Sequence, residues 1–265
     1  MRSVRAIRLT TWPTPGVLVI ADDRLSVTVW GGTRYGVLAL ALEDAGLSPC
    51  TTWVRCRTSV AGATATSTHG SGARNGSLST AVSALEFVGA DGSLRTVRRG
   101  DPEFLGSVIH LGADGVVTRV TLDVQPSYRI RQDVYLGVPW AALDDDGIRG
   151  LGYSKSHSTN CAADMAQMWV KSRIPAGQDD IDVPDELRSA KRRPARAAFV
   201  SEEDNTTPMD GTVGSRAMLL PHFRLDRIAS NGDEIQPSTL SPLTKAPKPW
   251  PPCAHSPTRS SRTCS

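Results

Sequence analysis

The order of the predicted elements indicates an α+β fold. A strand over residues 24–30 is followed by a helix over 35–45, a hairpin over 81–97, a short helix over 100–111 and a strand over 115–124. Strands and helices follow one another here without the regular strand–helix repeat of a parallel sheet. This order is what predicts the α+β class.

The first two elements have clear periodic patterns. Polar and apolar residues alternate over 24–30, which is typical of a half-buried strand, and Gly31-Gly32 ends it. Leucine and alanine then recur at helical spacing over 35–45. Gly46 stands where a helix commonly stops.

The hairpin has the strongest local signal. Its strands, 84–88 and 93–97, flank a turn that contains Asp91-Gly92. A short helix is expected to begin near Asp101, because acidic residues favour the first turn of a helix. The strand over 115–124 completes this part of the chain.

Four parts of the chain are predicted. Residues 1–23 form an irregular N-terminal segment, although 16–20 resembles a buried strand. Residues 24–127 form one folded part and 128–236 a second, whose strands lie at 130–136 and 167–171 and whose polar stretch 174–215 resembles a long surface loop. Residues 237–265 are rich in Pro, Ser, Thr and Arg, which predicts a disordered tail.

The overall composition excludes several classes of protein. The net charge of +3 is too small to indicate nucleic-acid binding, and the run Lys191-Arg192-Arg193 is typical of a solvated surface. No apolar run is long enough to span a membrane and no signal-type core follows the N-terminus, so the expected location is cytoplasmic. The five scattered cysteines are expected to be free thiols, and no metal site is expected.

Residues 59–80 form the segment of the sequence whose composition is most informative about function. They are rich in Gly, Ser, Thr and Ala, too small for a core helix and too regular for a linker. Glycines permit close backbone approach, and the short hydroxyls between them supply donors without bulk. The segment is consistent with an anion or cofactor loop. A flexible turn is the alternative.

The string SVAGATATSTHGSGARNGSL over residues 59–78 resembles a flavin-contacting loop of the FAD-linked alditol and xylitol oxidases, which belong to the vanillyl-alcohol-oxidase group. Segments 29–35, 85–99, 111–118 and 221–224 are similar to further pieces of that family in the same order. The resemblance implies the C-terminal part of a PCMH-type FAD-binding domain over 24–127, followed by a partial substrate (cap) domain over 128–236.

The resemblance also implies the cofactor, FAD, and the residues that contact it. His69 has an alternative role as a packed loop residue, and the resemblance identifies no catalytic residue in this chain. The implied cofactor-binding residues are Ser59, Gly62, Thr66, Ser67, Thr68, His69, Gly70 and Val117.

The chain departs from the family in three places. Residues 1–23 contain no histidine, whereas the family carries a flavin-linked histidine in a glycine-rich loop. Residues 52–58, shifted by one base, permit Met-Gly-Ser-Leu-Pro-His-Ile, which is close to the family's sequence at this point. A similar shift is permitted after Gln236, ahead of the family's catalytic acid, arginine and lysine. Residues 48–58 and 237–265 are therefore expected to be out of frame and irregular.

The function implied by the resemblance is oxidation of a polyol or aldonolactone CH–OH, with oxygen as the acceptor and hydrogen peroxide as a product. The expected partners are a small-molecule substrate and oxygen, with no nucleic acid and no membrane span. Because the implied site is incomplete, two alternatives stay open, a non-catalytic FAD-binding fragment and a pseudogene product. A nucleic-acid-associated protein is the least favoured reading.

Overall fold

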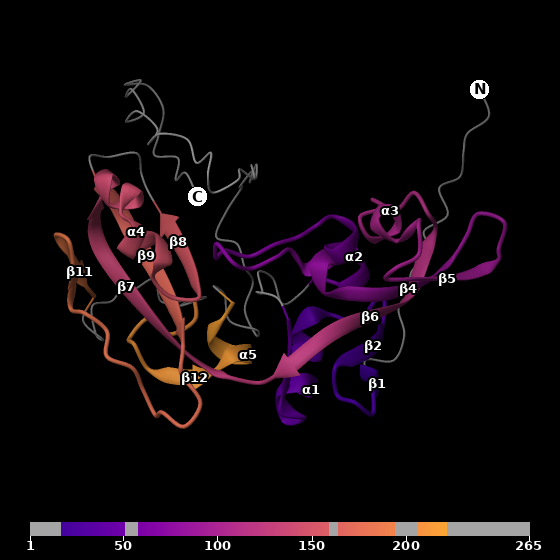
Figure 1. Cartoon of the computed structure of the whole chain (residues 1–265), viewed down its shortest axis with the longest axis horizontal. Helices are drawn as coiled ribbons and strands as arrows, with labels where there is room; N and C mark the ends of the chain where they lie inside the picture. Colours follow the sequence, from indigo (N-terminus) through magenta and orange to yellow (C-terminus); the bar gives the residue numbers. More distant parts are fainter. Residues whose placement is uncertain (1–16, 51–57, 159–163, 194–205, 222–265) are drawn as a thin grey trace, which may run out of the picture. The chain divides into compact units, whose positions relative to one another are not determined.

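The structure is a computed structural model that describes residues 17–50, 58–158, 164–193 and 206–221. The chain divides into two compact units. Unit 1 comprises residues 1–51, 55–69 and 76–126, and unit 2 comprises 52–54, 70–75 and 127–265. Each unit has its own sheet (Figure 1). That residues 24–127 bind the cofactor and residues 128–236 the substrate stays a prediction.

The sheet of unit 1 has the order β1-β2-β6-β4-β5, and β3 also pairs with β6. All these pairs are antiparallel. The strand β6 contacts three others, so it holds the sheet together. Its strands are β1 (Val17–Ile20), β2 (Ser26–Trp30), β3 (Leu47–Pro49), β4 (Val82–Val88), β5 (Leu94–Arg98) and β6 (Val116–Pro126).

The helices of unit 1 are short. The prediction for 35–45 is confirmed by α1, which runs over Tyr35–Asp44 and buries one stripe of side chains. Gly46 follows with φ +70, in the left-handed region that ends helices. The other helical elements are α2 (Val60–Ala65), η1 (Leu78–Ala81) and α3 (Phe104–Val108).

The expectation that residues 59–80 are too small for a core helix is wrong. Helix α2 buries Val60 and Ala63 completely, and Thr64 almost completely. The Thr64 hydroxyl donates to the Val60 carbonyl at 3.0 Å, so its polar group is satisfied inside the helix. Small side chains suit this position because they allow the helix backbone to approach its neighbours closely.

The predicted hairpin is confirmed by β4 and β5. At its turn, the Gly89 N–H donates to the Ser93 carbonyl at 3.0 Å, and Gly92 has φ +78. The Asp91 carboxylate accepts from the Ser93 N–H and hydroxyl, which lowers the pKa of this aspartate. The Asp-Gly pair thus fixes the turn as its sequence indicates.

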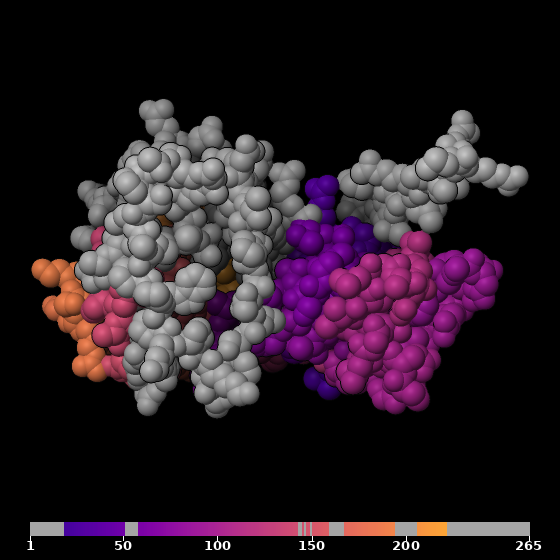
Figure 2. All heavy atoms as spheres, turned by 90° about the horizontal axis from the view of Figure 1, so that it is seen from above, coloured from indigo at the N-terminus to yellow at the C-terminus, as the bar shows by residue number. Residues whose placement is uncertain are grey.

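The surface of unit 1 includes β5 and α3. Four of the five residues of β5 are exposed, and Leu105 of α3 is 83% exposed. Figure 2 shows this part of the chain, in magenta, at the outside of the molecule. Two arginines of β5 therefore face solvent along an edge strand, which discourages pairing with other chains.

The sheet of unit 2 has the order β10-β11-β7-β9-β8, and β12 also pairs with β7. Helix α4 lies against it in Figure 1. Its strands are β7 (Arg129–Pro139), β8 (Ser154–Ser158), β9 (Asp164–Arg173), β10 (Glu186–Leu187), β11 (Ala190–Arg192) and β12 (Val213–Ser215). Its helical elements are η2 (Trp140–Asp144), α4 (Asp146–Gly150) and α5 (Arg216–Leu219).

A hydrophobic core covers one face of β7 and β9. Tyr135, Val138 and Met168 are completely buried in it, and the Tyr135 hydroxyl donates to the Pro184 carbonyl at 2.8 Å. Because the segment after Pro175 supplies this carbonyl and also β10 and β11, the prediction of one long surface loop over 174–215 is wrong. Its polar composition concealed buried positions such as Ile174 and Ala190.

Two further expectations are corrected. The predicted irregular segment 1–23 contains a strand, β1, whose pairing with β2 shifts register between Val17 and Val19. It is an edge strand in which Val19 is 62% exposed rather than buried. Residues 48 and 49 belong to β3 and are buried against β6, not irregular. The remaining expectations for 1–16, 51–57 and 237–265 lie outside the described residues.

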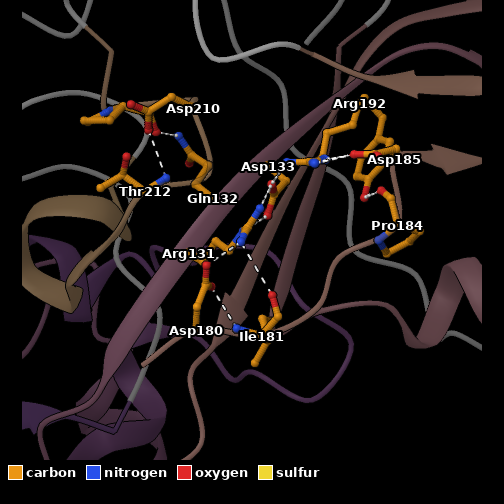
Figure 3. A network of polar contacts seen from close by, with 12 residues as sticks. Arg131, Gln132, Asp133, Asp180, Ile181, Pro184, Asp185, Arg192, Asp210 and Thr212 are labelled. Atoms are coloured by element: carbon orange, nitrogen blue, oxygen red, sulfur yellow. Dashed lines mark hydrogen bonds and ion pairs between the residues drawn. The ribbon is translucent and has the colours of Figure 1, made fainter. Parts of the chain in front are cut away.

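Ion pairs join β7 to the segments that follow it. Arg131 donates two hydrogen bonds to the Asp133 carboxylate, at 2.9 and 3.0 Å, and a third to Asp180 at 2.7 Å (Figure 3). Arg192 of β11 lies 3.5 Å from Asp133 and pairs with Asp185. Asp133 is only 2% exposed, so this network holds a buried carboxylate inside unit 2 together with the arginines that balance its charge.

His157 of β8 is expected to make unit 2 sensitive to acid. Burial and the nearby Lys155 lower the pKa of His157 to about 4, and its buried Nδ1 has no hydrogen-bond partner among the described residues. The unfolded chain binds a proton near pH 6.5 and the folded chain does not, so stability falls as the pH drops from 6.5 to 4. The loss amounts to about 3 kcal/mol.

Urea denaturation at pH 7 and at pH 4.5 measures this effect. His157→Leu should remove the part of the acid sensitivity that this group supplies, because leucine does not titrate. An unchanged difference between the two pH values in the variant would contradict the assignment.

Candidate functional site

The predicted cofactor loop begins at the N-terminus of α2. Ser59 is the N-cap of this helix, and its hydroxyl accepts from the Gly62 N–H at 3.3 Å. The first two helical N–H groups are also used. Val60 donates to the Thr33 carbonyl at 2.8 Å and Ala61 to the Gly31 carbonyl at 2.9 Å. The turn after β2 therefore fixes the start of α2.

At Gly31, the end of β2 lies very close to both β6 and α2. Its N–H donates to the Thr118 carbonyl at 2.9 Å, and an added Cβ would lie 2.5 Å from the Val117 carbonyl oxygen and 3.2 Å from the Ala61 Cβ. Only glycine allows β2, β6 and α2 to meet this closely. Val117, one of the predicted site residues, is itself 7% exposed.

A cluster of hydroxyls lies at the C-terminal end of α2. The Thr66 hydroxyl donates to the Gly62 carbonyl at 3.0 Å and lies 3.1 Å from the Thr68 hydroxyl. The Thr68 backbone is held on both sides, because its N–H donates to Ala63 and its carbonyl accepts from Leu78. Ser67, with φ +53, makes the sharp turn between them.

The structure brings five predicted residues together within unit 1: Ser59, Gly62, Thr66, Ser67 and Thr68. His69 is half-buried and also belongs to unit 1. Gly70 belongs to unit 2, so the boundary between the units passes through the predicted loop.

Thr33 is a residue that the sequence did not single out. It is 5% exposed, and its buried hydroxyl has no hydrogen-bond partner among the described residues. Its carbonyl holds the Val60 N–H at the start of α2. The sequence signal that could have identified this turn is the Gly31-Gly32 pair before Thr33, because paired glycines mark a close approach of backbone segments.

The other candidates have structural roles where they are described. The Nδ1 of His110 accepts from the Gly112 N–H at 2.9 Å. Asp145, the middle residue of the acidic run 144–146, caps α4 and pairs with Arg188. His222 and His255 lie outside the described residues. Within the described ranges, no group of three or more His, Cys, Asp or Glu residues is arranged to hold a metal ion.

A pocket of about 410 Å³ lies in unit 2, and none of the predicted cofactor-binding residues lines it. Its walls combine three small apolar residues of β7 and η2 with the Asp145–Arg188 ion pair. The pocket's hydrophobic walls do not resemble the hydroxyl-rich loop, so we place the candidate cofactor site at the loop. The lining residues are Pro139, Ala141, Ala142, Asp145 and Arg188.

No helix in the described part of the chain is long and apolar enough to cross a membrane.

Comparison with known proteins identifies relatives of this chain. Residues 6–98 match the family model of an FAD binding domain, which starts well before the predicted beginning at residue 24. An alditol oxidase of a Streptomyces species is 36% identical over 226 residues, which is 83% of this chain and 52% of that protein. An L-gulono-1,4-lactone dehydrogenase of Mycobacterium tuberculosis is 35% identical over 114 residues, or 40% of this chain and 24% of that protein.

The chain therefore spans about half the length of the alditol oxidase that it matches. Among solved structures, a cholesterol oxidase of Brevibacterium sterolicum has a TM-score of 0.54 at 21% identity, covering 64% of this chain and 36% of that one. A solvent-stable cholesterol oxidase has a TM-score of 0.55 at 21% identity, covering 63% of this chain and 36% of that one. These structures support the fold, which is a mixed α+β arrangement.

The residues at the loop fit FAD by their chemistry. They offer hydroxyls on small residues, which are neutral polar groups suited to a flavin edge or a diphosphate. The orphaned Thr33 hydroxyl adds one further polar atom at the adjoining turn. Residues 6–98 match the FAD binding domain model, and the resemblance of this chain to alditol and aldonolactone oxidases is confirmed.

Proposed function

We propose that this chain provides the FAD-binding loop and part of the substrate domain of an FAD-dependent oxidoreductase of the alditol or xylitol oxidase type. The substrate is a polyol or an aldonolactone, whose CH–OH group is oxidised with oxygen as the acceptor and hydrogen peroxide as the product. The observation that carries the proposal is the arrangement of Ser59, Gly62, Thr66 and Thr68 around α2, supported by the identity of the relatives.

The loop residues would hold FAD, which would supply hydride acceptance from the carbinol carbon and transfer of two electrons to oxygen, while the two protons lost by the CH–OH group complete hydrogen peroxide. The protein's part is to hold and orient the cofactor. Thr66 and Thr68 would present their hydroxyls to it, while Gly62 leaves the helix surface open, being exposed and without a side chain. His69 and Gly70 would continue the contact along the loop, and Ser59 and Val117 would border it from the start of α2 and from β6.

A non-catalytic FAD-binding fragment is the second candidate. The observation that favours it is the kind of residue at the predicted site, where Ser59, Gly62, Thr66, Ser67, Thr68 and Gly70 are suited to binding and none is assigned a catalytic role. In either case the proposed location is the cytoplasm, and the other proposed partners are a small-molecule substrate and oxygen.

Titration of the purified full chain with FAD tests the proposal. We expect one FAD per chain, with quenching or a shift of flavin fluorescence. Replacing both hydroxyls, by Thr66→Val with Thr68→Val, should weaken binding about 30-fold, since each of the two lost hydrogen bonds contributes about 1 kcal/mol.

The matched control is Thr96→Val, the same substitution at an exposed position of β5, which should leave the affinity unchanged. Peroxide production from a polyol then separates the enzyme from the binding fragment. A colourless protein that takes up no added FAD would count against both.

A further inference from the structure

The segment Gly70–Asn75 continues the predicted flavin loop and belongs to unit 2. Its first anchor is Ser71, whose hydroxyl lies 2.6 Å from the Ser154 hydroxyl and 3.4 Å from that of Ser156. Both partners are on β8, where they point to the same face because they are two residues apart. The loop is thus tied to a regular strand.

Asn75 is the second anchor. Its amide Nδ2 donates to the Ser71 carbonyl at 2.9 Å and to the Tyr153 carbonyl at 3.0 Å, so both N–H bonds of the amide can be used. The first bond closes the loop upon itself, and the second ties it to the residue that precedes β8. The Asn75 N–H also donates to the Gly72 carbonyl at 3.0 Å.

Gly72 leaves no room for any other residue. It has φ +115, and an added Cβ would lie 2.2 Å from the Asn75 Nδ2 and 2.5 Å from the Tyr153 carbonyl oxygen. A side chain here would displace the amide from its two acceptors. The loop therefore has a single conformation that depends on Gly72 and Asn75 together.

We infer that Asn75 is a positioning residue for the cofactor, acting through the loop that carries His69 and Gly70. This inference rests on the proposed function. When the Asn75 amide holds the Ser71 and Tyr153 carbonyls, the loop is ordered before FAD binds. Without these hydrogen bonds, FAD binding must order the loop, and the free-energy cost appears as weaker affinity for FAD.

FAD titrations of the full chain with Asn75→Ala and Asn75→Asp test the inference. The aspartate keeps the size of the side chain but places a carboxylate against two carbonyl oxygens. Both variants should bind FAD at least tenfold more weakly than the wild type, and the visible circular dichroism of the bound flavin should change. Thr96→Ala, at an exposed position of β5 outside this loop, is the control and should bind as the wild type does.

Thermal unfolding of the FAD-free proteins separates positioning from stability. The FAD titrations are made well below the unfolding temperature of every variant. A variant that is only less stable then keeps the wild-type affinity for FAD. Wild-type affinity in Asn75→Ala would therefore overturn the inference. Ser71→Ala provides a milder second variant if Asn75→Ala does not fold, and wild-type affinity there would overturn it too. Wild-type affinity in Asn75→Asp would show that the amide donor is not needed. If the wild type binds no FAD, the proposed function fails first, and the inference fails with it.

Discussion

Asp133→Ala is expected to lower the free energy of unfolding of unit 2 by about 3–5 kcal/mol, the range typical of breaking a buried ion pair. The substitution leaves Arg131, whose side chain is 11% exposed, without its bidentate partner. The hydrogen bonding that Arg131 donates to Asp133 is also the main cause that raises the pKa of Arg131, so its guanidinium stays charged. Urea denaturation followed by circular dichroism measures the change.

Asp180→Ala is the matched control for this prediction. Asp180 also pairs with Arg131, at 2.7 Å, but its side chain is 50% exposed, so its loss should cost no more than about 1 kcal/mol. Equal losses in the two variants would show that burial of Asp133 does not set the cost. The double variant Arg131→Met with Asp133→Leu should recover much of the stability, because no charge is then left buried.

Lys171→Met is expected to destabilise unit 2 by about 2–4 kcal/mol. The ammonium of Lys171, on β9, donates to the carbonyls of Leu219, Leu220 and Pro221 at 2.9, 2.5 and 3.0 Å, at the end of α5. Methionine fills similar space but removes the donor from all three carbonyls, of which Pro221 still accepts from the Thr207 hydroxyl at 2.8 Å. The removal of a buried charge offsets part of this cost.

The pH dependence gives a second readout for the same variant. Burial lowers the pKa of Lys171 from 10.5 to about 7. Between these values the unfolded chain binds more protons, so the contribution of this group to stability rises with pH from 7 to 10.5. Lys171→Met should lack that rise. Lys191→Met, at an exposed lysine of β11, should change neither stability nor its pH dependence, and a similar loss there would contradict the prediction.

The elements with local signals could be predicted from the sequence. The helix at α1 has a stripe of leucines and a glycine at its end, and the β4–β5 hairpin has an Asp-Gly turn. Each of these is encoded by neighbours in sequence, so its pattern is readable without the tertiary structure. The α+β class followed from their order.

The elements that depend on distant partners could not be predicted. Helix α2 is built from small residues whose burial depends on β6 and η1, and its composition resembled a loop. Arg131 and Asp133 can be buried on β7 because Asp180 and Arg192 form ion pairs with them. These partners lie some 50–60 residues later in the chain. Charged residues in sequence suggested exposure, and only the network explains why they are inside.

At the candidate site, the sequence identified the loop and the fold supplied the reasons for its shape. The hydroxyls of Thr66 and Thr68 are adjacent because Ser67 turns between them. Thr33 and Asn75 were not predicted, because their importance comes from contacts with Val60 and Tyr153 and not from a motif.

The central position of β6 has a consequence for synthesis of the chain. The β1–β2 pair, β3 and the β4–β5 hairpin are made first, and each of them joins the sheet only through β6. Until the ribosome has released residue 126, these pieces have unpaired edges and no common core. Unit 1 therefore completes its sheet late in its own translation, and a chain interrupted before residue 116 would lack the strand with which the β1–β2 pair, β3 and the β4–β5 hairpin all pair.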